Sequence, residues 1–278
     1  MKNKIALVTG GTSGVGLSIV RELVKNNFDV FFIGTNKERG REIEIALNNR
    51  GNTKNKFIAL ELSNINEVHA FANQFKSKVP QLDLLLNVAG VMLPSRQETA
   101  EGLEKTFAIG YLSAFILCNA FIPLLEKGNQ SRIINVSGGS SQVLKANLDF
   151  DNLNFEKNYS GFRTAIATVH AKTVLTQILS EKLKGKNIDV NAFHPGTVKS
   201  DLTRNIHFLL KGLARIATFF MASKSKNGIY VSLSNEIAGT TGQLFVNKKP
   251  TPLRFDKVYK EKLWEVTEGI VEKILLKN

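Results

Sequence analysis

The sequence predicts a doubly wound α/β protein with a mostly parallel sheet of about seven strands and helices on both faces. Three observations lead to this prediction. Short apolar runs of strand length alternate with stretches of helical periodicity along the whole chain. The apolar runs are continuous, which is typical of parallel strands covered by helices on both faces. A glycine-rich turn joins the first run to the first helical stretch.

Seven segments have the apolar character of buried strands. They are Ile5–Val8, Val30–Ile33, Phe57–Leu60, Leu82–Leu86, Arg132–Val136, Asp189–Phe193 and Leu244–Val246. Helical periodicity occupies residues 15–26, 37–49, 65–78, 101–125, 160–184, 226–235 and 256–276. Because ligands of such sheets bind beyond the carboxyl ends of the strands, we expect the functional residues just after these ends.

The composition is that of one globular domain, which we assign to residues 1–278. Apolar residues make up 43% of the chain and charged residues 22%, enough to build a large core. We find no window of about 18 uncharged apolar residues and expect no membrane-spanning helix. A strand begins at Ile5, so we expect no signal peptide and a cytoplasmic protein. The single cysteine, Cys118, is interpreted as a small buried hydrophobe.

The net charge of +13 comes from lysines and arginines spread along the chain. No nucleic-acid-binding motif accompanies them, so we expect no nucleic-acid partner and interpret the charge as a solvated basic surface. Attraction of anionic phosphates or of a membrane surface is the alternative. We predict no metal site.

The turn after the first strand has the spacing of a dinucleotide site. Glycines at 10, 14 and 16 allow a tight turn, close approach of a pyrophosphate and close packing of helix on strand. The helix that follows offers its unpaired N–H groups to the phosphates. A purely structural turn is the alternative. The predicted contacts in this turn are Thr9, Gly10, Thr12, Ser13, Gly14, Val15 and Gly16.

This Thr-Gly-x-x-x-Gly-x-Gly pattern resembles the glycine motif of the short-chain dehydrogenase/reductase family, and further landmarks follow in order. The segment 87–90 (Asn-Val-Ala-Gly) resembles the family's Asn-Asn-Ala-Gly motif, and 194–200 resembles its Pro-Gly turn beside the nicotinamide. Segments 153–156 and 263–266 resemble the retinol-dehydrogenase-like branch. The resemblance runs over essentially the whole chain and implies a Rossmann fold and an NAD(P)-dependent oxidoreductase. The nucleotide contacts it implies are Glu61, Leu62, Asn87, Ala89, Gly90, Pro195, Gly196, Thr197 and Val198.

The end of the second strand bears on the choice of cofactor. An acidic residue there suits the ribose hydroxyls of NAD, and basic residues suit the 2′-phosphate of NADP. The chain has Asn36 and Lys37 at this point, with Arg39 and Arg41 close by. We therefore favour NADP(H) over NAD(H), with Asn36 and Lys37 among the contacts. A solvated first turn of a helix is the alternative.

The family's catalysis uses a tyrosine, a lysine four residues later, a serine and an asparagine. Alignment of the resemblance places these at Ala165, Val169, Gly138 and Gly110, none of which can transfer a proton. Loss of one general acid usually costs about 10²–10⁴ in rate. Polar residues that could replace the four are Tyr111, Ser137, Ser140, His170 and Lys172.

Tyr159 and Arg163 are four residues apart, as the family's tyrosine and lysine are, but they lie six residues before the aligned positions 165 and 169. On a helix, such a shift moves a side chain by about 120° and about 9 Å. We interpret them as a loop tyrosine and an arginine at a helix start.

Residues 201–222 are rich in large apolar side chains and correspond to the family's substrate lid. Their character predicts a lipophilic small-molecule substrate. Lys211 and Arg215 lie four residues apart, so peripheral membrane contact is one alternative, and plain packing in the core is the other. The long helices at 101–125 and 160–184 are surfaces by which many relatives dimerise, and a homo-oligomer is left open.

Three hypotheses follow for function. The first is an atypical enzyme that binds NADP(H) and acts on a lipophilic molecule by non-standard, even redox-neutral, chemistry. The second is a catalytically dead nucleotide-binding pseudoenzyme that serves as partner or sensor. The third is an ordinary carbonyl reductase or alcohol dehydrogenase with relocated catalytic residues.

Overall fold

A computed structural model describes residues 3–49, 52–138, 141–196 and 225–276. The predicted lid at 201–222 and the predicted site residues Ser140, Thr197 and Val198 lie outside these ranges.

The structure is a doubly wound α/β fold with one eight-stranded sheet of order β3-β2-β1-β4-β5-β6-β7-β8. Neighbouring strands are parallel except β7 and β8, which pair as an antiparallel hairpin. The strands are β1 (Lys4–Thr9), β2 (Phe28–Gly34), β3 (Lys56–Ala59), β4 (Leu84–Asn87), β5 (Ser131–Val136), β6 (Ile188–Phe193), β7 (Gln243–Val246) and β8 (Lys249–Pro252).

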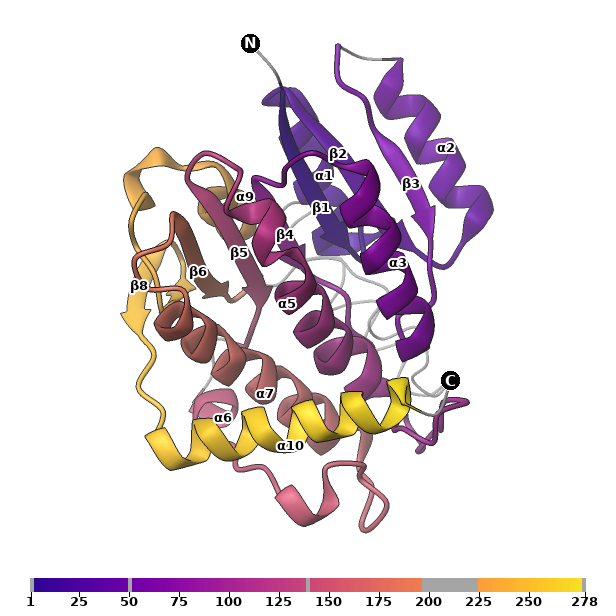
Figure 1. Cartoon of the computed structure of the whole chain (residues 1–278), viewed down its shortest axis with the longest axis vertical. Helices are drawn as coiled ribbons and strands as arrows, with labels where there is room; N and C mark the ends of the chain where they lie inside the picture. The colour runs from indigo at the N-terminus through magenta and orange to yellow at the C-terminus, as the bar shows by residue number, and fades with distance from the viewer. Residues whose placement is uncertain (1–2, 50–51, 139–140, 197–224, 277–278) are drawn as a thin grey trace, which may run out of the picture.

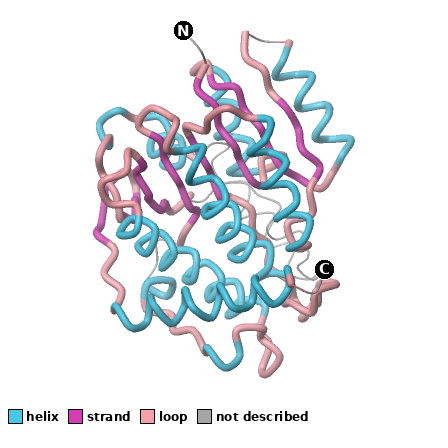
Figure 2. Tube along the Cα trace, in the orientation of Figure 1, coloured by secondary structure: helices cyan, strands magenta, loops and turns pink. Residues whose placement is uncertain are grey.

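Helices cover both faces of this sheet (Figures 1 and 2). The long ones are α1 (Gly14–Lys25), α2 (Lys37–Asn48), α3 (Ile65–Lys78), α5 (Ser113–Leu125), α7 (Gly161–Lys182), α9 (Lys226–Leu233) and α10 (Lys257–Leu275). Shorter ones are α4 (Lys105–Phe107), the π-helical η1 (Ala108–Leu112), α6 (Ser141–Leu144), and the 3₁₀ turns η2 (Phe150–Asn152) and η4 (Asn235–Ile237).

Two apolar clusters form the core. One lies between the sheet and α3, α5 and α7, and the C-terminal helix α10 packs onto it from outside. The other lies between the sheet and α1, α2 and α9. Because the central strands contribute fully buried residues to both clusters, they are apolar on both faces, as the continuous runs predicted.

Three details differ from the prediction. An eighth strand, β8, was missed because it contains two prolines, which argue against a strand away from a sheet edge. The helix expected over 101–125 begins at Lys105 and changes from π to α geometry at Ser113. Residues 105–125 have the length to cross a membrane; an 18-residue window within them has a mean hydropathy of 1.9, and 78% of that window is buried within the fold. The expectation that no helix could span therefore overlooked it, because scattered polar residues interrupt its apolar run.

Candidate functional site

The carboxyl ends of β1, β2, β4, β5 and β6 meet at one edge of the sheet, with the switch point between β1 and β4. The glycine turn follows β1 here. Gly10 has a φ of +66°, and a Cβ on it would lie 3.1 Å from the Cα of Ala89. A Cβ on Gly16 would lie 2.2 Å from the carbonyl oxygen of Gly10. A side chain at either position would separate the turn from α1 or from the end of β4.

The start of α1 has the properties of an anion site. Ser13 is the N-cap residue, its backbone is extended, and its side chain makes no capping hydrogen bond. No acidic residue lies in the first turn of the helix. The first-turn N–H groups and the positive end of the helix dipole therefore point to the sheet edge without a capping side chain, which suits a phosphate.

Thr9 joins the two strands at the switch point. Its hydroxyl oxygen accepts hydrogen bonds from the backbone N–H groups of Val88 (3.0 Å) and Ala89 (3.1 Å). The same hydroxyl lies 3.4 Å from the carbonyl of Leu86, to which it donates. Thr9 thus fixes the segment after β4 against the glycine turn.

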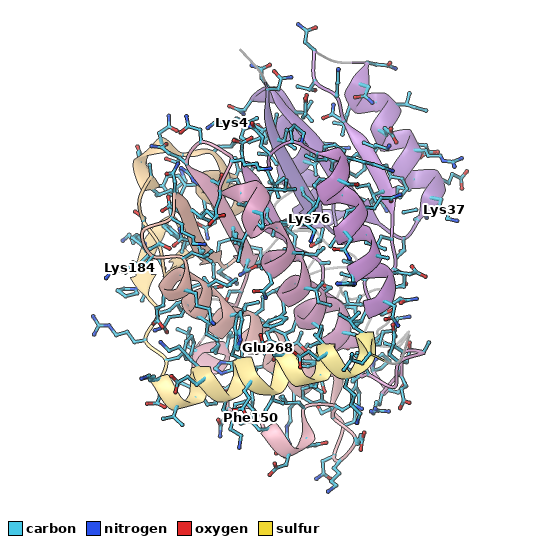
Figure 3. All side chains as sticks on the ribbon, viewed as in Figure 1. Lys4, Lys37, Lys76, Phe150, Lys184 and Glu268 are labelled. Carbon is cyan, nitrogen blue, oxygen red and sulfur yellow. The ribbon has the colours of Figure 1, made fainter. Side chains whose placement is uncertain are left out.

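The loop after β2 combines a close contact with an exposed basic residue. A Cβ on Gly34 would lie 2.6 Å from the hydroxyl of Thr12, so these two loops touch. The side chain of Asn36 accepts from the N–H of Arg39 (2.9 Å) and caps α2. Lys37 is exposed and stands at the outer edge of the molecule, at the start of α2 (Figure 3).

Two further predicted contacts are held by local hydrogen bonds. A carboxylate oxygen of Glu61 accepts from both the N–H and the hydroxyl of Ser63. The carbonyl of Pro195 accepts from the hydroxyl of Ser225 at 3.0 Å, and Gly196 has a φ of +75°. These bonds fix the geometry of the turns that follow β3 and β6. Leu62 is buried beside Glu61 in the core, and Gly90 has no neighbour within 4 Å of an added Cβ.

Two glycines at this edge face side chains that occupy the adjacent space. A Cβ on Gly110 would lie 2.5 Å from the methyl carbon of Thr168. A Cβ on Gly138 would lie 2.3 Å from a methyl carbon of Val143. At both positions a larger side chain would therefore require its neighbour to move.

Ala165 and Val169 lie one helical turn apart on α7, and both are half-buried. Tyr159 lies before this helix, where its hydroxyl donates to the carbonyl of Leu93 (3.0 Å) and lies 3.5 Å from a carboxylate oxygen of Glu104. Burial and the nearby Glu104 raise the pKa of Tyr159. The tyrosine therefore links the loop after β4 to the start of α7.

The predicted polar candidates Ser137 and Tyr111 contact other helices. The hydroxyl of Ser137 lies 2.6 Å from that of Thr173, which donates to the carbonyl of Val169. Ser137 is therefore the donor of that pair. Tyr111 is fully buried, its hydroxyl lies 2.8 Å from that of Thr267 on α10, and burial raises its pKa.

His170 is buried and hydrogen-bonded through both ring nitrogens. Its Nδ1 lies 2.6 Å from the carbonyl oxygen of Val143, which can only accept, so Nδ1 carries the proton. Its Nε2 then accepts from the hydroxyl of Tyr259 at 2.9 Å. Burial lowers the pKa of His170, and it is therefore neutral at pH 7.

Lys172 is the candidate that contacts a nucleotide motif. Its ammonium nitrogen lies 3.4 Å from the carbonyl oxygens of both Asn87 and Ala89. Burial lowers the pKa of this lysine to about 8, an effect partly offset by Cys118.

A buried polar network around Lys172 was not predicted. The Asn87 amide donates to the side-chain oxygen of Asn135 (2.9 Å) and to the sulfur of Cys118 (3.1 Å). The Asn135 amide donates to the hydroxyl of Thr176 at 3.0 Å. Cys118 is buried, as predicted, but it is also a hydrogen-bond acceptor. The available signal was the pairing of β4 with β5, which sets Asn87 opposite Asn135. In the described part of the chain, no group of three or more His, Cys, Asp or Glu has the arrangement of a metal site.

The family profile of the short chain dehydrogenases matches residues 4–208. The chain belongs to this family. It is 29% identical to retinol dehydrogenase 14 of Homo sapiens, over 98% of this chain and 87% of the relative. It is 31% identical to the polyprenol dehydrogenase of Danio rerio, over 96% and 86% of the respective chains.

Solved structures show the same fold. A protein of Mycobacterium paratuberculosis superposes with a TM-score of 0.73 at 20% identity, over 97% of this chain and 93% of that one. A blue fluorescent protein from a metagenomic library, solved in complex with NADPH, superposes with a TM-score of 0.67 at 21% identity, over 87% and 95% of the respective chains. The likeness confirms the Rossmann-like sheet flanked by helices.

Proposed function

We propose that this protein binds NADP(H) and a lipophilic small molecule, and that its chemistry does not use the family's ordinary proton relay. The observation that carries this proposal is the combination of an intact glycine turn with filled space at Gly110 and Gly138. Gly10 and Gly16 keep the close contacts of a nucleotide turn, whereas Thr168 and Val143 occupy the space that relay side chains would need.

The nucleotide would be held at the start of α1, along Thr9 to Gly16, and beside Ala89. NADP(H) is favoured because Lys37 is exposed after β2 and no acidic residue directly follows that strand. When bound, the nucleotide supplies a hydride donor or acceptor. The residues of this chain orient it through the helix N-terminus and the glycine turn.

A lipophilic ligand is supported by the names of two relatives, retinol dehydrogenase and polyprenol dehydrogenase, which both refer to long apolar alcohols. Ala165 and Val169, which we align with the family's tyrosine and lysine, also have small apolar side chains. We therefore expect the ligand to lie over an apolar stretch of α7.

A second candidate function, a nucleotide-binding protein without turnover, is favoured by a specific observation. The hydroxyls of Ser137 and Tyr111 and both ring nitrogens of His170 are engaged in contacts between elements. A group that has to exchange protons with a substrate needs access to it, which these contacts do not provide.

The test begins with titration of the purified protein with NADPH and NADH, followed by cofactor fluorescence and thermal shift. We expect NADPH to bind more tightly than NADH and to raise the melting temperature. Absence of binding by both would overturn the proposal.

Turnover is then measured with NADPH and retinal or a polyprenal. Without the relay, we expect reduction at least about 10²-fold slower than one general acid would provide. The variant A165Y/V169K restores a tyrosine and lysine one turn apart and is the matched comparison. Fast reduction by the wild type that is lost in Y159F would instead establish an ordinary reductase. Formation of a product without cofactor oxidation would establish redox-neutral chemistry, and absence of any product would favour the second candidate.

A further inference from the structure

Lys172 is a buried cation without a carboxylate partner among the described residues. Its side chain is 3% exposed, and none of the ion pairs in the described chain includes it. Its polar contacts are the carbonyls of Asn87 and Ala89. Burial of a charge compensated only by dipoles costs free energy of folding, and an apolar side chain of similar length would avoid that cost. A contribution to the stability of the fold therefore does not explain why a lysine occupies this position.

The position of Lys172 on α7 connects it to the site. Residues 165, 169, 172 and 176 lie within about 60° of one another around a helix of 3.6 residues per turn. Lys172 thus lies on the same face of α7 as Ala165 and Val169. This face leads to the buried polar network that contains Asn87 and Thr176. In that network the side-chain oxygen of Asn87 is buried and has no hydrogen-bond partner.

The segment after β4 is consequently held from two sides. Thr9 accepts from the N–H groups of Val88 and Ala89, and Lys172 donates to the carbonyls of Asn87 and Ala89. Gly10 packs directly on Ala89. Any shift of this segment would therefore move the backbone against which the glycine turn packs.

We propose that Lys172 is a positioning residue of the nucleotide site, whose ammonium holds the backbone of residues 87–89 in the form that the nucleotide turn packs against. The proposal rests on nucleotide binding as the function of this edge. Lys172 acts through the backbone it holds, and no role in proton transfer is assigned to it.

The charge of Lys172 makes this role dependent on pH. The pKa of Lys172 is lowered to about 8 by burial. Cys118 on α5 is the titratable group that faces it, and burial raises the pKa of that thiol to about 12. From β4 and β5, the facing side chains are Asn87 and Asn135, which do not titrate. Among the described groups, Lys172 is therefore the one with a pKa moved into the range between pH 7 and 9.

Fold stability and nucleotide affinity should respond to rising pH in opposite directions. The folded-state pKa lies below the unfolded value, so the unfolded chain binds more protons between about pH 8 and 10.5, and the contribution of Lys172 to stability rises with pH there. Nucleotide affinity falls over the same range, because the neutral amine holds the two carbonyls more weakly. A purely structural lysine would not produce this divergence.

The experiment measures the Kd for NADPH by fluorescence titration and the melting temperature from pH 7 to 9.5 in the wild type, K172M and K182M. Lys182 is an exposed lysine of the same helix, 3.9 Å from the ring centre of Trp264, and is the matched control. If only the protonated form is competent, the wild-type Kd rises about tenfold between pH 7 and 9. We expect K172M to bind at least about tenfold more weakly at pH 7, with no dependence on pH and an equal or higher melting temperature. K182M should follow the wild-type Kd curve.

Equal affinity and an equal pH profile in K172M and the wild type would overturn the proposal. If K172M does not fold, the wild type alone still tests the proposal, because its Kd must rise between pH 8 and 9.5. A wild type that binds NADPH with no pH dependence overturns the role of Lys172 alone. A wild type that does not bind NADPH at pH 7 overturns the proposed function as well.

Discussion

At the scale of single residues, Gly110 leaves space that the side chain of a neighbour, Thr168, occupies. The hydroxyl of Thr168 donates to the carbonyl of Thr164 at 2.8 Å, which fixes its rotamer. Its methyl carbon then points at Gly110, at 2.5 Å from an added Cβ. Because protein interiors are closely packed, the two residues form one unit, and a larger side chain at 110 requires a change at 168 as well.

We predict that G110A destabilises the protein by about 1–3 kcal/mol through overpacking. In a T168S background, where the methyl group is gone, the same change should cost markedly less. Urea unfolding of the two single variants and the double variant measures the difference. G269A is the control, because Gly269 lies in α10 with nothing within 4 Å of an added Cβ. It should stabilise by about 0.5–1 kcal/mol, and a similar gain for G110A would contradict the packing argument.

At the scale of elements, α10 joins parts of the chain that are distant in sequence. Tyr259 donates to His170 of α7 and accepts from the N–H of Leu148, in the segment after α6. His170 in turn donates to the carbonyl of Val143 within α6. One hydrogen-bonded chain thus connects α10, α7 and the segment that borders Gly138, and it needs His170 to be neutral.

The connection predicts loss of stability in mild acid. Burial lowers the folded-state pKa of His170 below its ordinary 6.5, so the unfolded chain binds more protons as the pH falls below 6.5, and stability is lost there. His194 also has a lowered pKa and contributes with the same sign. Unfolding free energies between pH 5 and 7 should therefore fall less steeply in H170Q than in the wild type. Parallel curves for H170Q and the wild type would contradict this assignment.

At the scale of the whole molecule, α10 packs against α5 and α7, the two helices that the sequence suggested as a possible dimer surface. Trp264 packs edge-on against Phe115 of α5 at 4.9 Å and lies under Lys182 of α7. Thr267 meets Tyr111, and Figure 1 shows α10 running across α7 and α5. This face is already occupied by the chain itself.

We predict that the face formed by α5 and α7 is not a dimer interface. Hydrogen–deuterium exchange of residues 113–125 and 161–182 should not change when protein concentration is raised through any association step seen by sedimentation. Protection of α7 that increases with concentration would show that α10 is displaced in an oligomer.

The sequence predicted the elements well where the signal is local. The strands and most helices follow from apolar runs, and the glycine turn follows from spacing within eight residues. The packing of Thr168 against Gly110 and the contacts of Lys172 could not be predicted in the same way. Lys172 and Asn87 are separated by 85 residues, and their contact depends on strand order and on a rotamer. The same limit applies to Thr168, whose helical position gives no sign that its methyl group faces Gly110.

The hairpin strand β8 has a consequence for how the protein behaves at high concentration. Leu253 donates its N–H to Gly242, on the side of β7, so by the two-residue period of a strand the N–H groups of residues 249 and 251 also face β7. The positions that face outward are Pro250 and Pro252, which have no N–H group. Residues 249–252 therefore offer no N–H donors to an approaching strand, and this disfavours extension of the sheet by a second molecule at this border, the step that would begin a fibril.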